Sequence, residues 1–246
     1  MRIFIVISLY LFSLISPFSA HSAETISSRF IKNFVYYVYW SGIRAGKAEL
    51  QFELTPQEVT IRTRATSASF ISLFYPVDDR SETVLYPNGY PKSSVVKINQ
   101  GRHKRDKATY FEPWEKNKPQ KVTYYNKLDE EKEEFTFNSP AYDPLSAFYA
   151  MTKMPLSIGT SEFIDIFDTK KVWHTEIQVL KKEKIHVQGK AFNTILIKPL
   201  LKSEGIFRKT GDILIWATDD DKKLPVMMKS KATIGTFTVE LAEGDY

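Results

Sequence analysis

The chain has 246 residues, no cysteine and a formal net charge of +5, and its lysines and acidic residues are interspersed through most of its length. Without cysteine, a lipid-modified N-terminal cysteine, a disulfide framework and a thiol nucleophile are excluded. The mixed charges are typical of a solvated surface rather than of a polyanion site.

The first residues are typical of a secretory signal peptide. A positively charged start precedes an apolar run at residues 3–15, and small residues follow it. Cleavage is expected near Ser22 or Ala23, which separates residues 1–23 from a single domain at 24–246. The apolar run is shorter than the ~20 residues that a spanning helix needs. We therefore expect a periplasmic protein that does not span the membrane after cleavage.

Beyond this leader the dominant sequence period is two, with apolar and polar residues in alternation. Ala48, Leu50 and Phe52, for example, alternate with Glu49 and Gln51. This alternation places side chains on opposite faces of a β-strand. Strands are expected at residues 34–40, 47–54, 59–64, 93–99, 108–111, 122–126, 134–137, 162–167, 173–180, 184–188, 193–200, 211–217 and 232–241.

Turn sequences separate these runs, as at residues 87–89, 188–190 and 219–221. Many short strands without a fixed repeat predict an all-β fold, either an antiparallel barrel or a strongly curved sheet or sandwich. An outer-membrane barrel is disfavoured, because such strands are about ten residues long and have an uncharged lipid face.

Two short helices are expected to accompany the sheet. Asp143 suits a helix N-cap, and Pro144 fits the first helical position. A second helix of one or two turns is expected within residues 67–75. Both place apolar side chains on one side, so we expect them to lie against the sheet, across one end of a barrel. The side chains on these faces are Leu145, Phe148, Tyr149 and Thr152 in the first helix and Phe70, Leu73 and Phe74 in the second.

Familiar catalytic and metal-binding signatures are absent from the sequence. It has no glycine-rich phosphate loop, G-x-S-x-G elbow or H-E-x-x-H helix. His103, His174 and His186 have no second histidine at metal-ligand spacing. The acidic pairs and runs at 78–79 and 219–221 could serve a glycosidase or a calcium ion, but adjacent strand residues point to opposite faces, and a polar turn explains the second run. No metal and no cofactor are expected.

Aromatic residues and one basic run are the remaining candidates for binding. Aromatic side chains suit a wide cavity or a sugar platform, and equally an ordinary β core. Arg102, Lys104 and Arg105 follow Gly101 and could contact lipopolysaccharide phosphates or an anionic membrane face, or form the charged tip of a hairpin. The aromatic candidates for ligand binding are Tyr37, Tyr39, Trp40, Phe74, Phe148, Trp173 and Trp216.

Five stretches of the chain carry a family resemblance. They are YWSGIRAGKA at 39–48, FYPVDD at 74–79, DPLSAFY at 143–149, GKAFNT at 189–194, and GDILIWATD at 211–219 with LPV at 224–226. In this order they resemble an exported bacterial family known as domain of unknown function 3108. The resemblance implies a periplasmic all-β protein and no established reaction, and it carries over no functional residues.

The leading hypothesis is a non-enzymatic periplasmic binding or carrier protein, in which a curved sheet and its helices enclose a pocket for a lipid-like or amphiphilic envelope molecule. One alternative is an envelope assembly or interaction factor that binds another protein through a sheet edge. The other is a hydrolase of envelope glycan or lipid that uses Asp78 and Asp79. The expected partners are thus an amphiphile or an envelope protein, and nucleic acid is not expected in this compartment.

Overall fold

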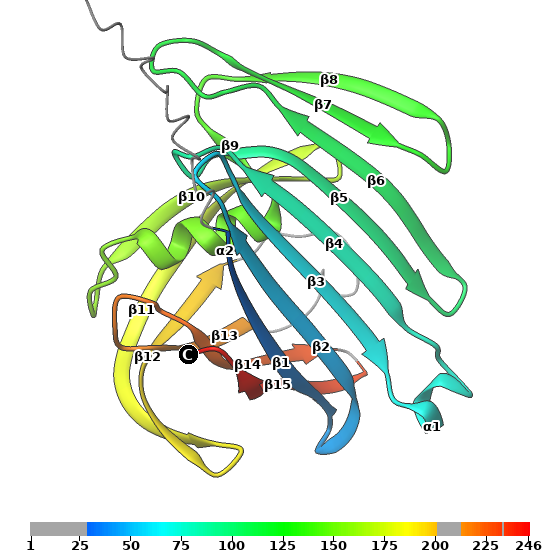
Figure 1. Cartoon of the computed structure of the whole chain (residues 1–246), viewed down its shortest axis with the longest axis vertical. Coiled ribbons are helices and arrows are strands. Elements are labelled where there is room, and N and C mark those ends of the chain that lie inside the picture. Colours follow the sequence, from blue (N-terminus) through cyan, green and yellow to red (C-terminus); the bar gives the residue numbers. More distant parts are fainter. Residues whose placement is uncertain (1–28, 201–212, 233) are drawn as a thin grey trace, which may run out of the picture.

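The computed structural model describes residues 29–200, 213–232 and 234–246, which form one large curved sheet and two short helices (Figure 1). The predicted signal peptide lies outside the described residues, as do the first two residues of the strand expected from residue 211. The strands are β1 (Phe30–Trp40), β2 (Ile43–Leu54), β3 (Val59–Ser67), β4 (Asp78–Leu85), β5 (Pro91–Gln100), β6 (His103–Phe111), β7 (Gln120–Asn126), β8 (Glu131–Phe137), β9 (Ala141–Tyr142), β10 (Ser161–Asp168), β11 (Lys171–Val187), β12 (Lys190–Leu200), β13 (Ile213–Thr218), β14 (Pro225–Ala232) and β15 (Gly235–Gly244).

Most strands pair with their neighbours in the sequence, as expected when short turns connect them. The order across the sheet is β8-β7-β6-β5-β4-β3-β2-β1-β15-β14-β13-β12-β11-β10-β9. Among the described strands only β9 and β10 pair in parallel. Strand β1 pairs with both β2 and β15, so the first and last described strands lie side by side.

Side chains bring the two ends of this sheet toward each other. The ring of Phe167 on β10 lies 5.6 Å from that of Phe137 on β8, measured between centroids. Lys170, in the β10–β11 turn, places its Nζ 2.6 Å from carboxylate oxygens of both Glu131 and Glu133 on β8. The sheet is therefore a nearly closed barrel, which confirms the prediction of an all-β barrel or strongly curved sheet with short helices.

Helix α2 (Pro144–Lys153) lies inside this barrel, between its two walls (Figure 1). Leu145 and Tyr149 pack against a core cluster from β1–β4 and β11–β15, whereas Ala147 and Met151 are buried among isoleucines of β10–β13. The helix therefore contacts apolar side chains on more than one face, and the interior around it is occupied by the core.

The second expected helix is a single turn, α1 (Ser69–Ser72), at the far end of the β3–β4 connection (Figure 1). Its apolar side was expected to lie against the sheet, and this expectation is wrong: Leu73 is 80% and Phe74 88% exposed. The backbone N–H of Ser67 donates to the Val77 carbonyl at 3.1 Å, which closes the segment at its base. The segment therefore projects outward and does not reach across the barrel.

Several strands differ from the runs expected from the alternation. Strand β11 is continuous where two runs were expected, and its register against β12 shifts between Val179 and Lys181. A bulge at Leu180 thus bends one long strand without breaking it. Strands β4, β9 and β14 were not expected. Polar residues interrupt the apolar pattern of β4 and β14, yet each of these two is paired on both sides. Strand β9 has only two residues and pairs with β10.

Candidate functional site

A groove with a volume of about 590 Å³ crosses the outer face of strands β1 to β5. Three neighbouring rows of residues build it, each row running across all five strands. Because side chains alternate between faces, the two flanking rows point outward and the middle row points into the core. The first flanking row is Asn33, Gln51, Arg62, Glu82 and Val95, the middle row is Phe34, Leu50, Thr63, Ser81 and Val96, and the second flanking row is Val35, Glu49, Arg64, Arg80 and Lys97. All of these residues except Val96 line the groove.

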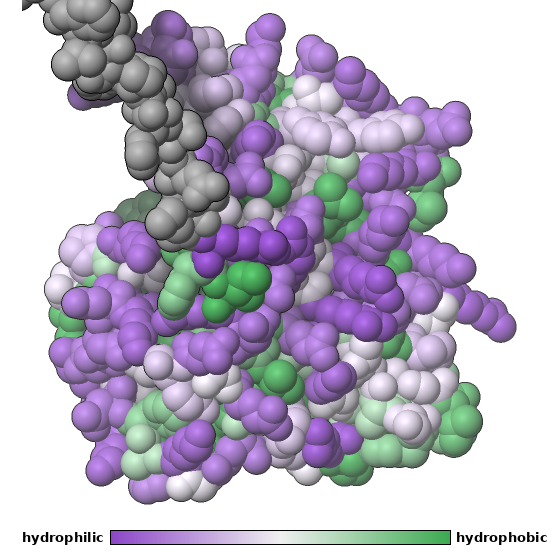
Figure 2. All heavy atoms as spheres, in the orientation of Figure 1, coloured by the Kyte–Doolittle hydropathy of each residue, from purple (hydrophilic) through white to green (hydrophobic). Residues whose placement is uncertain are grey.

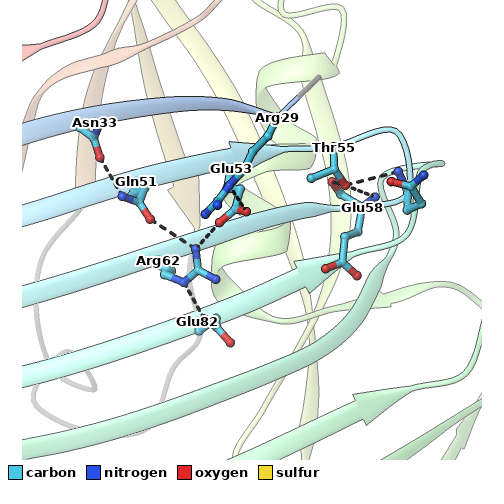
Figure 3. A network of polar contacts seen from close by, with 9 residues as sticks. Arg29, Asn33, Gln51, Glu53, Thr55, Glu58, Arg62 and Glu82 are labelled. Atoms are coloured by element: carbon cyan, nitrogen blue, oxygen red, sulfur yellow. Dashed lines mark hydrogen bonds and ion pairs between the residues drawn. The ribbon is translucent and has the colours of Figure 1, made fainter. Parts of the chain in front are cut away.

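Arg62 organises the first flanking row (Figure 3). Its Nε donates to Glu82 Oε2 at 2.6 Å, and its Nη1 donates to Glu53 Oε2 at 2.7 Å and to Gln51 Oε1 at 3.3 Å. The Gln51 amide then donates to Asn33 Oδ1 at 2.8 Å. Figure 3 shows these side chains on the face of the sheet that is turned away from α2. Hydrogen bonds from Arg62 and then Arg29 hold the pKa of Glu53, which lies beside this row, below its usual range.

Two arginines of the second flanking row converge on one carboxylate. Arg64 donates from Nε and Nη2 to the two Asp78 oxygens at 2.9 and 3.2 Å, and Arg80 does the same at 3.3 and 3.0 Å. Hydrogen bonds from Arg64 and then Arg80 lower the pKa of Asp78 to about 2. A planar guanidinium fork matches a carboxylate or phosphate with two parallel hydrogen bonds. This pair of arginines therefore defines a position for an anion, which Asp78 fills.

Cations outnumber acids along the groove. The basic lining residues are Arg62, Arg64, Arg80 and Lys97, and the acidic ones are Glu49 and Glu82. The side chains of Arg80 and Lys97 are 58% and 59% exposed, and exposed ion pairs contribute little to stability. The arginines can therefore exchange an internal partner for an anionic ligand at small cost.

The seven aromatic residues expected to bind a ligand lie in several separate places. Tyr37 lies beneath the guanidinium of Arg44, whose Cζ is 3.5 Å from the ring centre. The Tyr39 hydroxyl accepts a hydrogen bond from Gln188 Nε2 at 3.0 Å. Trp216 is buried in the core. These three residues do not share one cavity.

The other four aromatic candidates also divide between interior and surface. Phe148 packs inside the barrel from α2. Trp173 is half-buried on β11. Trp40 and Phe74 are both solvent-exposed. The indole Nε1 of Trp40 donates to the Ile234 carbonyl at 2.8 Å. A role of these side chains in ligand binding stays a prediction.

The basic run expected to contact anions begins in the β5–β6 turn and continues into β6. Arg102 and Lys104 are exposed and Arg105 is half-buried. The backbone N–H of Gly101 donates to the Pro76 carbonyl at 2.8 Å, so this turn is joined to the segment that carries α1. Anion contact by these residues also stays a prediction.

The two acidic clusters have local partners. Whereas Asp78 pairs with arginines, Asp79 accepts from the backbone N–H of Asn99 at 2.9 Å and from Gln100 Nε2 at 2.5 Å. Adjacent carboxylates here serve different partners and do not form an acid and base pair. In the 219–221 run, Asp220 Oδ1 accepts hydrogen bonds from Thr218 Oγ1 and two backbone N–H groups, as in a polar turn. In the described part of the chain no group of three or more His, Cys, Asp or Glu residues could hold a metal ion.

The groove residues are the ones that sequence reasoning missed. Arg62 and Arg64 occupy alternate positions of one expected strand, and Arg80 belongs to a strand that was not expected. Alternating cations within one run are a detectable signal, but their convergence depends on the register of β3 against β4.

Comparison with known proteins places this architecture in a family. The model of a family described as protein of unknown function, DUF3108, matches residues 35–242. The chain belongs to this family. The matched region of this DUF3108 protein begins in β1 and ends in β15, so it includes strands β2 to β5 of the groove and most of β1. The family resemblance expected from the five sequence stretches is confirmed.

One solved structure supports the description of the DUF3108 chain as barrel-like. It is the crystal structure of a beta-barrel-like protein of domain of unknown function DUF1849 from Brucella abortus, which matches with a TM-score of 0.60. The match covers 87% of this chain and 97% of the other, at 13% sequence identity, so the likeness shows the fold alone. None of the curated proteins matches the chain significantly. No helix within residues 29–200, 213–232 and 234–246 is long and apolar enough to cross a bilayer.

Proposed function

We propose that this DUF3108 protein is a non-enzymatic binding or carrier protein of the periplasm, and that it holds an anionic amphiphile in the outer groove. The observation that carries the proposal is the convergence of Arg64 and Arg80 on one anion position. The periplasmic location is proposed from the signal-peptide pattern of residues 1–23.

The groove has the size and the chemistry for such a ligand. Its volume lies within the range of roughly 300–1,000 Å³ that is usual for small-molecule sites. The second flanking row supplies cations for an acidic headgroup, namely Arg64, Arg80 and Lys97. Val35 and Val95 line the groove at its two ends, and the aliphatic stems of the arginines add apolar surface for the remainder of the molecule.

The ligand is proposed on the outer face and not in an enclosed pocket. Helix α2 occupies the interior, where Tyr149 packs on one core cluster and Met151 is buried in another. A carrier that binds at the outer face exposes part of its cargo, which suits exchange with a second acceptor.

The test is mass spectrometry of organic extracts from the protein, purified from its own compartment without detergent. We expect a stoichiometric anionic amphiphile in the unmodified protein and at least about tenfold less in the double variant R64A/R80A, because charge-assisted bidentate contacts are lost. The matched control is K121A/K132A, which removes two exposed cations of β7 and β8 and should leave the cargo unchanged.

Two results would refute the proposal. An empty protein would shift support to the alternative of an envelope assembly factor, whose partner would then be sought by crosslinking in cells. A cargo that is retained in full by R64A/R80A would place the binding site elsewhere on the molecule.

A further inference from the structure

The α1 segment presents large apolar side chains to solvent. Leu73 and Phe74 are 80% and 88% exposed, and Phe70 is half exposed. No charged residue occurs from Ser67 to Val77. Burial of such side chains is strongly favourable in globular proteins, so an exposed apolar group of this kind marks an interaction surface. Figure 2 shows the hydrophobic group over α1 at the lower right of the molecule.

This segment is held in place by its own hydrogen bonds. The hydroxyls of Ser67 and Ser72 lie 2.7 Å apart, and Ser67 Oγ also accepts from the backbone N–H of Val77 at 2.9 Å. The ring of Tyr75 lies against Gly101, where an added Cβ would be 3.2 Å from it. The apolar side chains are therefore presented by a preorganised tip, which lowers the ordering cost of binding.

Neighbouring turns add apolar side chains at the same end of the sheet. The backbone N–H of Ala68 donates to the Ala45 carbonyl at 2.7 Å, which joins the α1 segment to β2. Trp40, at the end of β1, donates to the carbonyl of Ile234 in the β14–β15 turn at 2.8 Å. Figure 1 shows these turns together along the lower right of the barrel. We name this surface the α1 rim, and its exposed apolar residues are Trp40, Ile43, Phe70, Leu73, Phe74 and Ile234.

Cations accompany the apolar residues of the α1 rim. Arg102 and Lys104 are exposed on the β5–β6 turn, which bonds directly to the α1 segment through Gly101. Two acidic residues follow the α1 segment. Asp78 is paired with two arginines, and Asp79 accepts hydrogen bonds from neutral donors of β5, so the cations around them remain in excess. The charge beside the tip is therefore positive and complementary to an anionic surface.

We propose that the α1 rim docks this protein onto the surface of an anionic phospholipid bilayer. Leu73 and Phe74 enter the headgroup and upper acyl region, and Arg102 and Lys104 remain at the level of the lipid phosphates. Interfacial binding combines buried apolar area with attraction to anionic lipids, and aromatic residues favour this depth. This inference does not depend on cargo in the groove, because none of the exposed apolar residues of the α1 rim lines it.

The test is co-sedimentation of the mature protein with large unilamellar vesicles. One set is phosphatidylcholine alone, and the other is equal parts phosphatidylcholine and phosphatidylglycerol. We expect binding to the mixed vesicles, weakened by high salt, and at least about tenfold weaker binding of L73S/F74S. The charge variant R102A/K104A should lose roughly tenfold on mixed vesicles and none on neutral ones.

Matched controls keep this test specific. I158S replaces a residue that is 54% exposed outside the α1 rim and should bind as the unmodified protein does. Thermal unfolding by circular dichroism checks that L73S/F74S is folded, as expected for side chains with so little burial. L73S/F74S leaves the groove arginines in place and should retain the cargo, so failure of the carrier proposal and failure of membrane docking give different results.

Three outcomes would overturn the docking proposal. The first is that the unmodified protein stays in the supernatant with mixed vesicles. In the second, L73S/F74S sediments as well as the unmodified protein. The third is equal binding to neutral and mixed vesicles, which would remove the anionic specificity.

Discussion

Asp143 caps helix α2 with the same carboxylate oxygen that accepts a hydrogen bond from Thr83 of β4. Oδ1 lies 2.7 Å from Thr83 Oγ1 and 3.1 Å from the backbone nitrogen of Leu145, and Ser94 of β5 donates to it at 3.2 Å. Ser146 donates to the second oxygen at 2.5 Å. One buried side chain thus both starts the helix and joins it to the wall of the barrel that carries the groove.

Replacing Asp143 with alanine is expected to lower the free energy of unfolding by about 3 kcal/mol, because the helix loses its cap and the hydroxyls of Thr83 and Ser94 lose a buried partner. Urea unfolding followed by circular dichroism measures the change. D221A, at an exposed turn position, is the control and should stay within about 0.5 kcal/mol of the unmodified protein. A loss of similar size in both variants would show that the contacts of Asp143 are not the cause.

The stability contribution of Asp143 should depend on pH. Burial raises the pKa of its carboxyl, and hydrogen bonds from Ser146 and Thr83 only partly oppose this. Above the ordinary pKa the folded state then binds more protons than the unfolded state, so this group makes stability fall as pH rises. The amide introduced by D143N does not titrate. The unfolding free energy of D143N relative to the unmodified protein should therefore increase between about pH 4 and neutral pH. Parallel stability curves for the two proteins would contradict the prediction.

Asp78 is expected to compete with the ligand for Arg64 and Arg80. Its pKa of about 2 means that it is ionised at neutral pH and occupies both guanidinium groups. We expect D78N to bind octyl phosphate at least about threefold more tightly than the unmodified protein, since the internal anion is removed. Isothermal titration below the critical micelle concentration provides the measurement. D220N, in the β13–β14 turn, is the control, and weaker binding by D78N would show that Asp78 positions the arginines instead.

At Gly46, β2 approaches β3 too closely to leave room for a side chain. A Cβ added there would lie 2.2 Å from the Thr66 carbonyl oxygen, which is backbone and cannot rotate away. G46A is therefore expected to force the strands apart and to destabilise the fold by about 1–3 kcal/mol. Thermal or urea unfolding would detect this loss. The neighbouring exposed variant K47A should change stability by less than about 0.5 kcal/mol, and an equally mild effect of G46A would contradict the reasoning.

Local sequence patterns predicted the local features well. Asp143 and Pro144 marked the start of α2, and alternation in residues such as Leu50 and Phe52 marked a strand with one face in the core. These features depend on neighbours a few positions away, where backbone preferences and side-chain periodicity act directly.

Features that depend on distant pairing could not be predicted in the same way. The convergence of Arg64 and Arg80 requires a specific register, and a shift by one residue would reverse the faces. The solvent exposure of the apolar residues of α1 was also not predicted. An apolar stripe on a short helix does not reveal whether the core of the same protein or an external partner covers it. Leu73 and Phe74 have the sequence pattern of core residues, but their side chains are exposed to solvent.

The pairing of β1 with β15 joins segments that lie far apart in the sequence. The backbone N–H of Asn33 donates to Asp245 across 212 positions of sequence, at 2.8 Å. Contacts of such separation close slowly, because loop entropy must be overcome before they form. Strand β1 therefore keeps an unpaired edge until β15 is in place, whereas a circular permutant that links β15 to β1 and opens the β7–β8 turn would make this seam a local hairpin.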